Sequence, residues 1–225
     1  MQPRSAEERR AELVQLYREA EVCARCPLSK TRTKVVFGSG NADADLMFVG
    51  EAPGVHEDQQ GLPFVGRAGQ LLTKLLEEIG MSREAVFIAN VLQSRPPGNR
   101  DPQPDEIDAC KPFLHRKIKL IEPKVICTLG NFATKLLTRS QRGITSVHGR
   151  PQVHELGGRA VRVFPIYHPA AALRSTRTLE ELREDFARLP ALLQEPPPVP
   201  VGAVAPVVAG VGARPSQPAP PTLFD

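Results

Sequence analysis

The chain has 225 residues, of which 41% are hydrophobic, and its 29 Lys and Arg against 25 Asp and Glu give a formal charge of +4. This composition excludes wholesale disorder, and no apolar run approaches the ~20 residues that span a bilayer. The first ten residues are polar and lack the apolar core of a secretory signal, so we expect a cytoplasmic protein that associates with the nucleoid.

Hydrophobic periodicity predicts helices that alternate with short apolar strands along most of the chain. In chain order we expect a helix over 7–21, a strand over 45–49, a helix over 67–79, a strand over 86–91, a helix over 104–121, a strand over 124–129, a helix over 131–137, strands over 151–154 and 160–166, and a helix over 178–193. Val- and Ile-rich strands that alternate with helices indicate an α/β protein with a mostly parallel sheet covered on both faces.

The composition changes near residue 195. From Pro196 to Asp225, nine of the thirty residues are prolines, and only Arg214 and Asp225 carry side-chain charge. The stretch has neither a helical nor a strand period. We therefore predict a folded domain over 1–193 and a disordered, proline-rich tail over 194–225.

Three unusual loops follow predicted strands, at 50–66, 90–102 and 167–175. Parallel strands end at the same edge of a sheet, where ligands bind in α/β folds, so these loops are expected to converge on one site. The loop 50–66 is rich in glycine, which lets a ligand approach the backbone closely. It lacks the spacing of a P-loop or of a dinucleotide-binding fold.

Several residues in these loops have a structural and a functional interpretation. Phe64 is either a core residue or a platform on which a base stacks, and Asn90 either caps a turn or reads a base. A carboxamide can accept from N3–H of uracil and donate to O4, whereas cytosine presents the reverse pattern. His168, held before Pro169, is either a structural histidine or a group that binds a developing anion.

Two further pairs of residues are candidates for DNA contacts. Arg95 and Arg100 flank a rigid Pro-Pro-Gly turn, which suits either phosphate contacts or a solvated surface turn. Leu173 and Arg174 are consistent with a wedge beside a phosphate contact, or with ordinary loop packing.

Together, the motifs of these loops resemble those of the family 4 uracil-DNA glycosylases, which are bacterial and archaeal base-excision enzymes. The motifs are GEAPG (50–54), ED (57–58), PFVGRAGQLL (63–72), Asn90 followed by RPPGNR (95–100), and HPA (168–170). The resemblance covers about residues 10–190 and implies a three-layer α/β/α fold. It also implies an enzyme that flips deoxyuridine out of single- or double-stranded DNA and hydrolyses its N-glycosidic bond. No suitably placed Lys nucleophile is evident, so we expect an abasic site without strand cleavage.

The resemblance also implies roles for individual residues. The substrate-binding residues would be Gly50, Ala52, Phe64 and Asn90, and the DNA contacts would be Arg95, Arg100, Leu173 and Arg174. Among the catalytic candidates, His168 would stabilise the charge that develops on O2 of the leaving base, as in an oxyanion hole. Glu51 or Asp58 would orient the attacking water.

The four cysteines predict thiols or metal ligands rather than disulfides. Cys23 and Cys26 form a CxxC motif, typical of half a metal or cluster site. The resemblance implies a [4Fe–4S] cluster whose other ligands are Cys110 and Ser94, the latter at a position that is normally Cys. Cys127 lies in a predicted strand and is expected to be a buried hydrophobe. Three outcomes stay open, namely that Ser94 ligates, that an outside ligand or an open iron site completes the cluster, or that the cluster is labile or absent.

Other functions remain as alternatives. One is a protein of the same fold that binds or cross-links uracil-DNA with little turnover. A nucleophilic His after Asn90 would favour covalent trapping, and this chain has Gln93-Ser94-Arg95 instead. A small-molecule nucleotide hydrolase would need a clustered acidic metal site. We expect a monomer that binds no membrane. The terminal Leu223-Phe224 is either a peptide that docks on a sliding clamp or a hydrophobic end without function.

Overall fold

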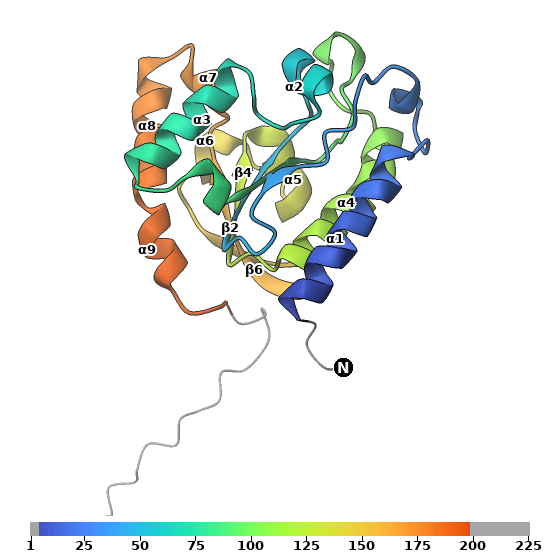
Figure 1. Cartoon of the computed structure of the whole chain (residues 1–225). Helices are drawn as coiled ribbons and strands as arrows, with labels where there is room; N and C mark the ends of the chain where they lie inside the picture. Colours follow the sequence, from blue (N-terminus) through green and yellow to red (C-terminus); the bar gives the residue numbers. More distant parts are fainter. Residues whose placement is uncertain (1–4, 199–225) are drawn as a thin grey trace, which may run out of the picture.

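The computed structural model describes residues 5–198, so most of the predicted tail, including Leu223-Phe224, lies outside the described residues. Within this range a six-stranded sheet lies between two layers of helices (Figure 1). The strands, in their order across the sheet, are β1 (Ser39–Gly40), β3 (Phe87–Asn90), β2 (Leu46–Gly50), β4 (Val125–Leu129), β6 (Arg159–Ile166) and β5 (Gln152–Leu156).

The four central strands are parallel, and the two edge strands β1 and β5 are antiparallel to their neighbours. The predicted mostly parallel sheet is therefore confirmed. The strand predicted over 151–154 is β5, which forms a hairpin with β6 through Gly157 and Gly158. Both glycines have left-handed backbone angles, with φ of 62° and 82°, as a tight two-residue hairpin turn requires.

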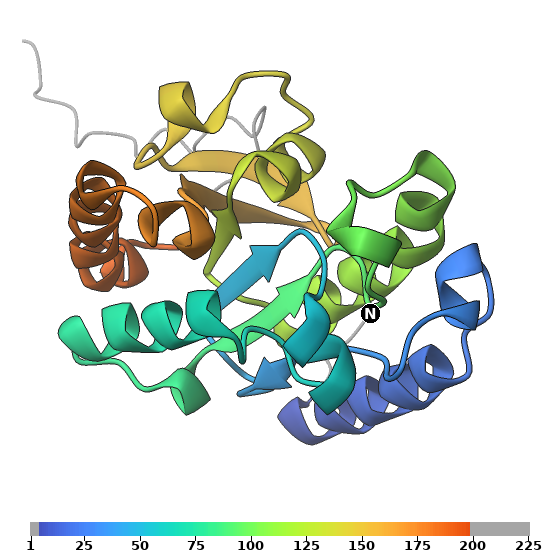
Figure 2. The ribbon, with the colours of Figure 1, turned by 90° about the horizontal axis from the view of Figure 1, so that it is seen from above.

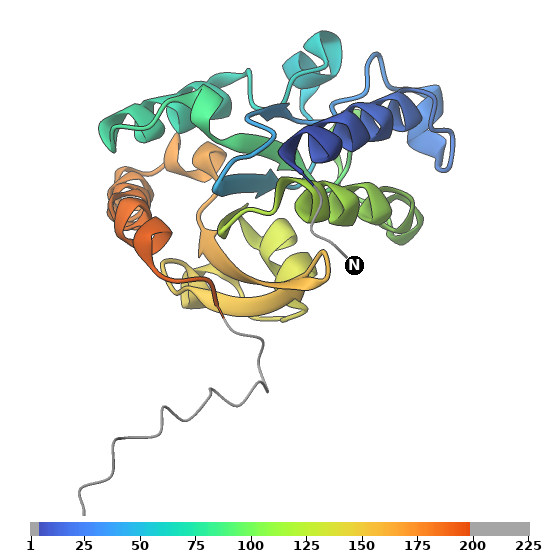
Figure 3. The ribbon, with the colours of Figure 1, turned by 60° about the horizontal axis from the view of Figure 1, so that its bottom comes forward.

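Helices cover both faces of the sheet, as Figures 1 and 3 show. One face carries α3 (Arg67–Glu78), α7 (Pro169–Ala172), α8 (Thr176–Ala187) and α9 (Leu189–Gln194), and the other carries α1 (Ala6–Glu21), α4 (Pro104–Ile121) and α5 (Asn131–Thr138). Strand residues alternate between the two cores. Leu46 and Phe48 pack toward α3 and α8, and Met47 and Val49 pack toward α1 and α4.

The remaining short elements lie in the connections. They are α2 (Val55–Gln60), α6 (Ile144–Val147) and the 3-10 turns η1 (Pro27–Lys30), η2 (Arg83–Ala85) and η3 (Pro97–Asn99). The helix predicted over 178–193 is two helices, because Pro190 lacks the N–H that would continue α8 beyond Ala187. No helix between residues 5 and 198 is long and apolar enough to cross a bilayer.

Candidate functional site

The structure brings the three predicted loops together at one edge of the sheet, above the carboxyl ends of β2, β3 and β6 (Figure 2). A cavity of about 430 Å³ opens there. The residues that line it are Glu51, Ala52, Pro53, Gly54, Glu57, Phe64, Ala68, Asn90, Pro96, Asn99, Arg100, His168 and Ala170. The cavity therefore combines segments that are more than a hundred residues apart in the sequence.

Asn90 forms the floor of this cavity at the end of β3. Its side chain is only 2% exposed, and its Oδ1 atom is buried without a hydrogen-bond partner. A buried, unpaired acceptor costs free energy, so such atoms are rare and point to a missing donor. Gly50 pairs with Asn90 in the parallel register of β2 and β3, and its lack of a side chain leaves room for this oxygen, since a Cβ atom there would lie 2.4 Å from it.

Phe64 stands against Asn90 in a strained loop. Its φ of 52° lies in the left-handed region that is uncommon for non-glycine residues. Two features hold it there. Glu57 Oε1 accepts hydrogen bonds of 2.9 Å from the backbone N–H groups of both Val65 and Gly66. A Cβ atom on Gly69 would lie 1.8 Å from the Phe64 carbonyl oxygen, so the start of α3 packs directly on this backbone.

His168 caps the short helix α7 and faces Phe64, with ring centroids 5.6 Å apart. Its Nδ1 atom accepts a hydrogen bond of 3.1 Å from the Ala170 N–H. Burial lowers the pKa of His168 to about 4, although the nearby Glu57 carboxylate opposes this shift. The imidazole is therefore neutral at physiological pH, and because Nδ1 is the acceptor, Nε2 carries the hydrogen and can donate it.

The lowered pKa of His168 makes the stability of the protein depend on pH. The imidazole pKa is near 6.5 in an unfolded chain and about 4 in the folded protein. Between pH 4 and 6.5, His168 is therefore protonated in the unfolded chain and neutral in the folded protein. The contribution of neutral His168 to stability is therefore complete above about pH 6.5 and is lost as the pH falls toward 4. When the pH falls from 7 to 4.5, the free energy of unfolding should decrease in both proteins, and the decrease should be about 2 kcal/mol smaller in His168→Gln than in the parent protein. Urea denaturation measures this, and equal declines in both proteins would contradict it.

The two acidic candidates of the first loop lie in different surroundings. Glu51 lines the cavity, and burial together with the negative charge of Asp101 raises its pKa. Asp58 is 6% exposed and does not line the cavity. Both of its carboxylate oxygens accept from the Thr33 N–H, at 3.0 and 3.2 Å. Asp58 thus fixes the loop before β1 to α2, and the position beside the cavity belongs to Glu51.

The turn at 95–100 forms one rim of the cavity. Arg100 makes a two-pronged ion pair with Glu106, which is fully buried in the first turn of α4 and also accepts from the Gln103 N–H at 2.8 Å. Arg95 donates to Asn99 Oδ1 at 2.7 Å across the turn. These contacts preform the rim and leave part of the Arg100 guanidinium exposed.

Leu173 and Arg174 lie beyond the cavity, at the end of α7. Leu173 is 40% exposed, and Arg174 is exposed beside it. Neither lines the cavity. Their place on the same edge of the sheet as the cavity suits contact with a ligand larger than the cavity itself.

Glu57 and Glu106 are two residues whose roles in the site were missed by sequence reasoning. Glu106 carried a signal, because it stands three residues after Gln103 at a helix start, the spacing of a capping box. Glu57 carried none beyond its membership of the ED motif. Its hydrogen bonds go to backbone N–H groups, which have no sequence signature.

The three cysteines of the predicted ligand set lie on one side of the sheet. Cys110 is buried in the core formed with α1 and α4, and Cys23 and Cys26 pack against the same core. Burial raises the pKa of the Cys110 thiol, and Cys26 and Cys23 add to the rise. Cys127 is fully buried in the core on the opposite face of the sheet. It is thus the buried hydrophobe that its strand predicted and is separated from the other three.

Ser94 comes directly after Gln93, whose backbone opposes the rise in the pKa of Cys110. Ser94 is 3% exposed, and its Oγ atom lies 3.5 Å from Arg32 Nη1. In residues 5–198, no three His, Cys, Asp or Glu side chains are grouped closely enough for a single metal ion. A four-iron cluster is bulkier than one ion and holds its thiolates farther apart. Three thiols that pack at one core fit such a group, and Ser94 or an outside ligand would take the fourth place.

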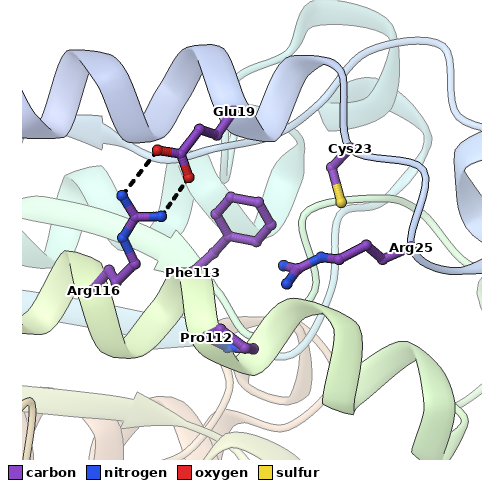
Figure 4. A pocket seen from close by; sticks show the side chains of 6 residues that line it. All are labelled: Glu19, Cys23, Arg25, Pro112, Phe113 and Arg116. Atoms are coloured by element: carbon purple, nitrogen blue, oxygen red, sulfur yellow. Dashed lines mark hydrogen bonds and ion pairs between the residues drawn. The ribbon is translucent and has the colours of Figure 1, made fainter.

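Cys23 also faces a cavity of about 260 Å³ between the end of α1 and α4 (Figure 4). Glu19 and Arg116 form an ion pair at one end of this cavity, with one contact of 3.0 Å. At the other end, the Arg25 guanidinium lies 4.6 Å from the centre of the Phe113 ring. The cavity accounts for the partial exposure of Cys23.

Comparison with known proteins identifies the family. Residues 37–189 match the model of the uracil DNA glycosylase superfamily. The type-4 uracil-DNA glycosylase of Sulfurisphaera tokodaii is 46% identical over 182 residues, which cover 79% of this chain and 83% of that protein. The type-4 enzyme of Thermotoga maritima is 47% identical over 168 residues, which cover 74% of this chain and 86% of that protein. The chain therefore belongs to the uracil DNA glycosylase superfamily and, within it, to the type-4 group.

Proposed function

We infer that this chain removes uracil from DNA as the first step of base-excision repair, in the cytoplasm and on the nucleoid. The observation that carries this inference is the buried, unpaired Oδ1 of Asn90 at the floor of the cavity. Uracil carries an N–H at N3 beside a carbonyl at O4, so it supplies both the donor that Oδ1 lacks and an acceptor for the Asn90 amide. Cytosine has an acceptor at N3 and would leave Oδ1 unpaired.

A base must leave the duplex to enter a cavity of this depth. We propose that Phe64 stacks on the flipped uracil while Asn90 binds its edge, and that the backbone at Gly50, Glu51 and Ala52 closes the pocket. Stacking on an aromatic ring contributes ~1–3 kcal/mol per base. Phe64 is suited to this because Glu57 and Gly69 fix its backbone, so little freedom is lost on binding.

Uracil is a tolerable leaving anion, so the C1′–N1 bond can break before water attacks. Neutral His168 would donate from Nε2 to O2, where the negative charge develops, and backbone N–H groups would assist, as in an oxyanion hole. Glu51 would orient the water that attacks C1′ and would stabilise the cationic sugar. Its place on the cavity wall supports this role over Asp58, whose oxygens bind the Thr33 N–H.

We propose that the DNA backbone runs over the edge of the sheet that carries the cavity. Arg95 and Arg100 would contact phosphates at one rim, and Arg174 would do so at the other. The exposed Leu173 would fill the space that the flipped nucleotide leaves in the stack.

We further propose that Cys23, Cys26 and Cys110 hold a [4Fe–4S] cluster, with Ser94 at the fourth position. When bound, the cluster would cross-link the end of α1, the segment before the 95–100 turn and α4. Iron and sulfide analysis of anaerobically purified protein tests this assignment, and iron at background level would refute it.

The activity itself is tested with single- and double-stranded oligonucleotides that carry one uracil. We expect strand breaks only after treatment with alkali, because the enzyme leaves an intact backbone at the abasic site. Breaks without alkali would show a lyase activity. A protein that binds uracil-DNA but releases no free uracil would support the non-catalytic alternative.

Glu57 lines the cavity and should position Phe64 through its hydrogen bonds to the loop backbone. We expect Glu57→Ala to lower kcat/KM for uracil excision by about tenfold to a hundredfold, because two backbone hydrogen bonds to the loop are lost. Glu57→Gln is the matched control, since its amide oxygen can still accept both bonds, and it should retain most of the activity. Equal losses of activity in the two variants would show that excision depends on the negative charge of Glu57 and not on its hydrogen bonds to the loop.

A further inference from the structure

Lys117 is an unusual residue in this protein. It lies on α4 with 0% exposure, and it is the only buried lysine or arginine between residues 5 and 198. Its Nζ atom donates to the Phe37 carbonyl and to Gln93 Oε1, the latter at 2.9 Å, and lies 4.1 Å from the centre of the Phe37 ring. All three contacts are neutral.

The buried carboxylates in the described part of the chain each have a donor beside them. Glu106 pairs with Arg100, Asp185 contacts His148, and Asp58 accepts from the backbone N–H of Thr33. The Lys117 ammonium has no carboxylate among its contacts in residues 5–198. A buried ammonium without a counter-charge is costly, because its desolvation is not repaid.

The surroundings of Lys117 indicate where an anion belongs. Cys110 lies two turns earlier on the same helix, and its thiol is the titratable group whose charge acts on Lys117. Gln93 joins Lys117 to the predicted ligand set, since its Oε1 accepts from Lys117 and it directly precedes Ser94 in the chain. Burial lowers the pKa of Lys117 to about 7, whereas a thiolate at Cys110 would raise it and keep the lysine charged.

We propose that Lys117 is the buried counter-charge of the iron–sulfur cluster held at Cys23, Cys26 and Cys110. The proposal rests on the cluster assigned above. Each thiolate ligand brings one negative charge into the same core, and the ammonium, one residue removed through Gln93, compensates part of it. Lys117 touches neither DNA nor the reacting atoms, so it acts as a positioning and charge-balancing residue.

The proposal predicts that the effect of removing Lys117 depends on whether iron is present. Lys117→Met keeps the length and the apolar stem of the side chain but removes the charge. In the iron-loaded protein we expect Tm to fall by about 5–10 °C, because the anionic cluster loses its buried partner. In protein stripped of iron by a chelator we expect a clearly smaller fall in Tm, because the Phe37 carbonyl and Gln93 Oε1 lose their donor but no anion loses its counter-charge. A purely structural role for the Phe37 and Gln93 contacts would lower Tm equally in both forms and would overturn the proposal.

Two further variants make the experiment decisive. Lys119→Met, on the exposed side of the same helix, should leave Tm unchanged in both forms. Lys117→Gln keeps a donor for the Phe37 carbonyl and serves if the Met variant fails to fold. In it we expect iron loss to a chelator, followed by absorbance, to be at least about tenfold faster than in the parent protein. An unchanged rate would refute the charge-balancing role.

Failure of this proposal can be separated from failure of the others. If the anaerobically purified parent protein contains no iron, both the cluster and the role of Lys117 are refuted, while uracil release by the same sample still tests the enzymatic function. If iron is present and Lys117→Met lowers Tm equally with and without it, the counter-charge alone is refuted.

Discussion

Asn90→Ala is expected to lower kcat/KM for uracil excision by about a thousandfold or more. The variant removes both hydrogen bonds to the edge of the base, one of which involves the acceptor that is buried and unpaired in the free protein. The bond from the Asn90 amide to O4 strengthens as negative charge spreads over the leaving uracil, so its loss should appear in kcat as well as in KM. Single-turnover assays on a uracil-containing oligonucleotide, followed by alkali, measure the effect.

The same variant should not weaken the fold by a comparable amount. In the parent protein the unpaired Oδ1 atom costs free energy, so its removal offsets part of the packing that the shorter side chain loses. Asn131→Ala is the matched control, because Asn131 Oδ1 accepts from the Ile144 N–H at 2.7 Å and serves the fold. We expect Asn131→Ala to lower the urea midpoint and to retain excision. Retained excision in Asn90→Ala would refute the assignment of the pocket.

Most of the fold could be predicted from the sequence because its elements have strong hydrophobic periods. The helix expected over 104–121 has those bounds in the structure, and the central strands are shifted by one residue at most. The short elements β1, α6 and α7 escaped prediction, and so did two further features. The helix α2 spans six residues, VHEDQQ, and is too short and too polar to show a period. The break between α8 and α9 depends on one proline within an otherwise continuous apolar pattern.

The place of the site was predictable from topology, since parallel strands deliver their following loops to one edge. The orientation of individual side chains was not. Glu57 and Asp58 are neighbours in one motif, but successive residues of a helix point about 100° apart. One carboxylate therefore binds the loop that carries Phe64, and the other binds the Thr33 backbone. Hydrogen bonds to backbone groups decide such roles, and they appear only when the fold is known.

The left-handed backbone conformation of Phe64 could likewise not be predicted from the sequence. Most residues with positive φ in this chain are glycines, and a sequence pattern would have assigned that angle to a neighbouring glycine of the loop. Packing decides otherwise, because Gly69 lets the start of α3 press against the Phe64 carbonyl. The strained conformation of Phe64 thus depends on Gly69, five residues further along the chain.

Gly50→Ala is expected to abolish most excision while leaving the fold intact. A Cβ atom at this position would lie 2.4 Å from Asn90 Oδ1 and 2.7 Å from Phe64 Cζ, far inside contact distance. Both side chains border the cavity of about 430 Å³ and can move into it, so the clash displaces them without disturbing the core. Because a displacement of about 1 Å in a positioned group costs about a hundredfold in rate, two displaced groups predict a loss of a hundredfold to a thousandfold.

Gly143→Ala is the control for this prediction. Its backbone φ of −73° suits any residue, and a Cβ atom there would meet nothing closer than 3.8 Å. We expect it to excise uracil at the parental rate, with Tm values of both variants close to that of the parent. If Gly50→Ala kept the parental rate, Asn90 and Phe64 could not together form the surface that binds the base. If it lost activity only with a large fall in Tm, the defect would lie in the fold. A loss of excision at unchanged Tm would show that the side chains of Asn90 and Phe64 can occupy one pocket only because Gly50 has no Cβ atom.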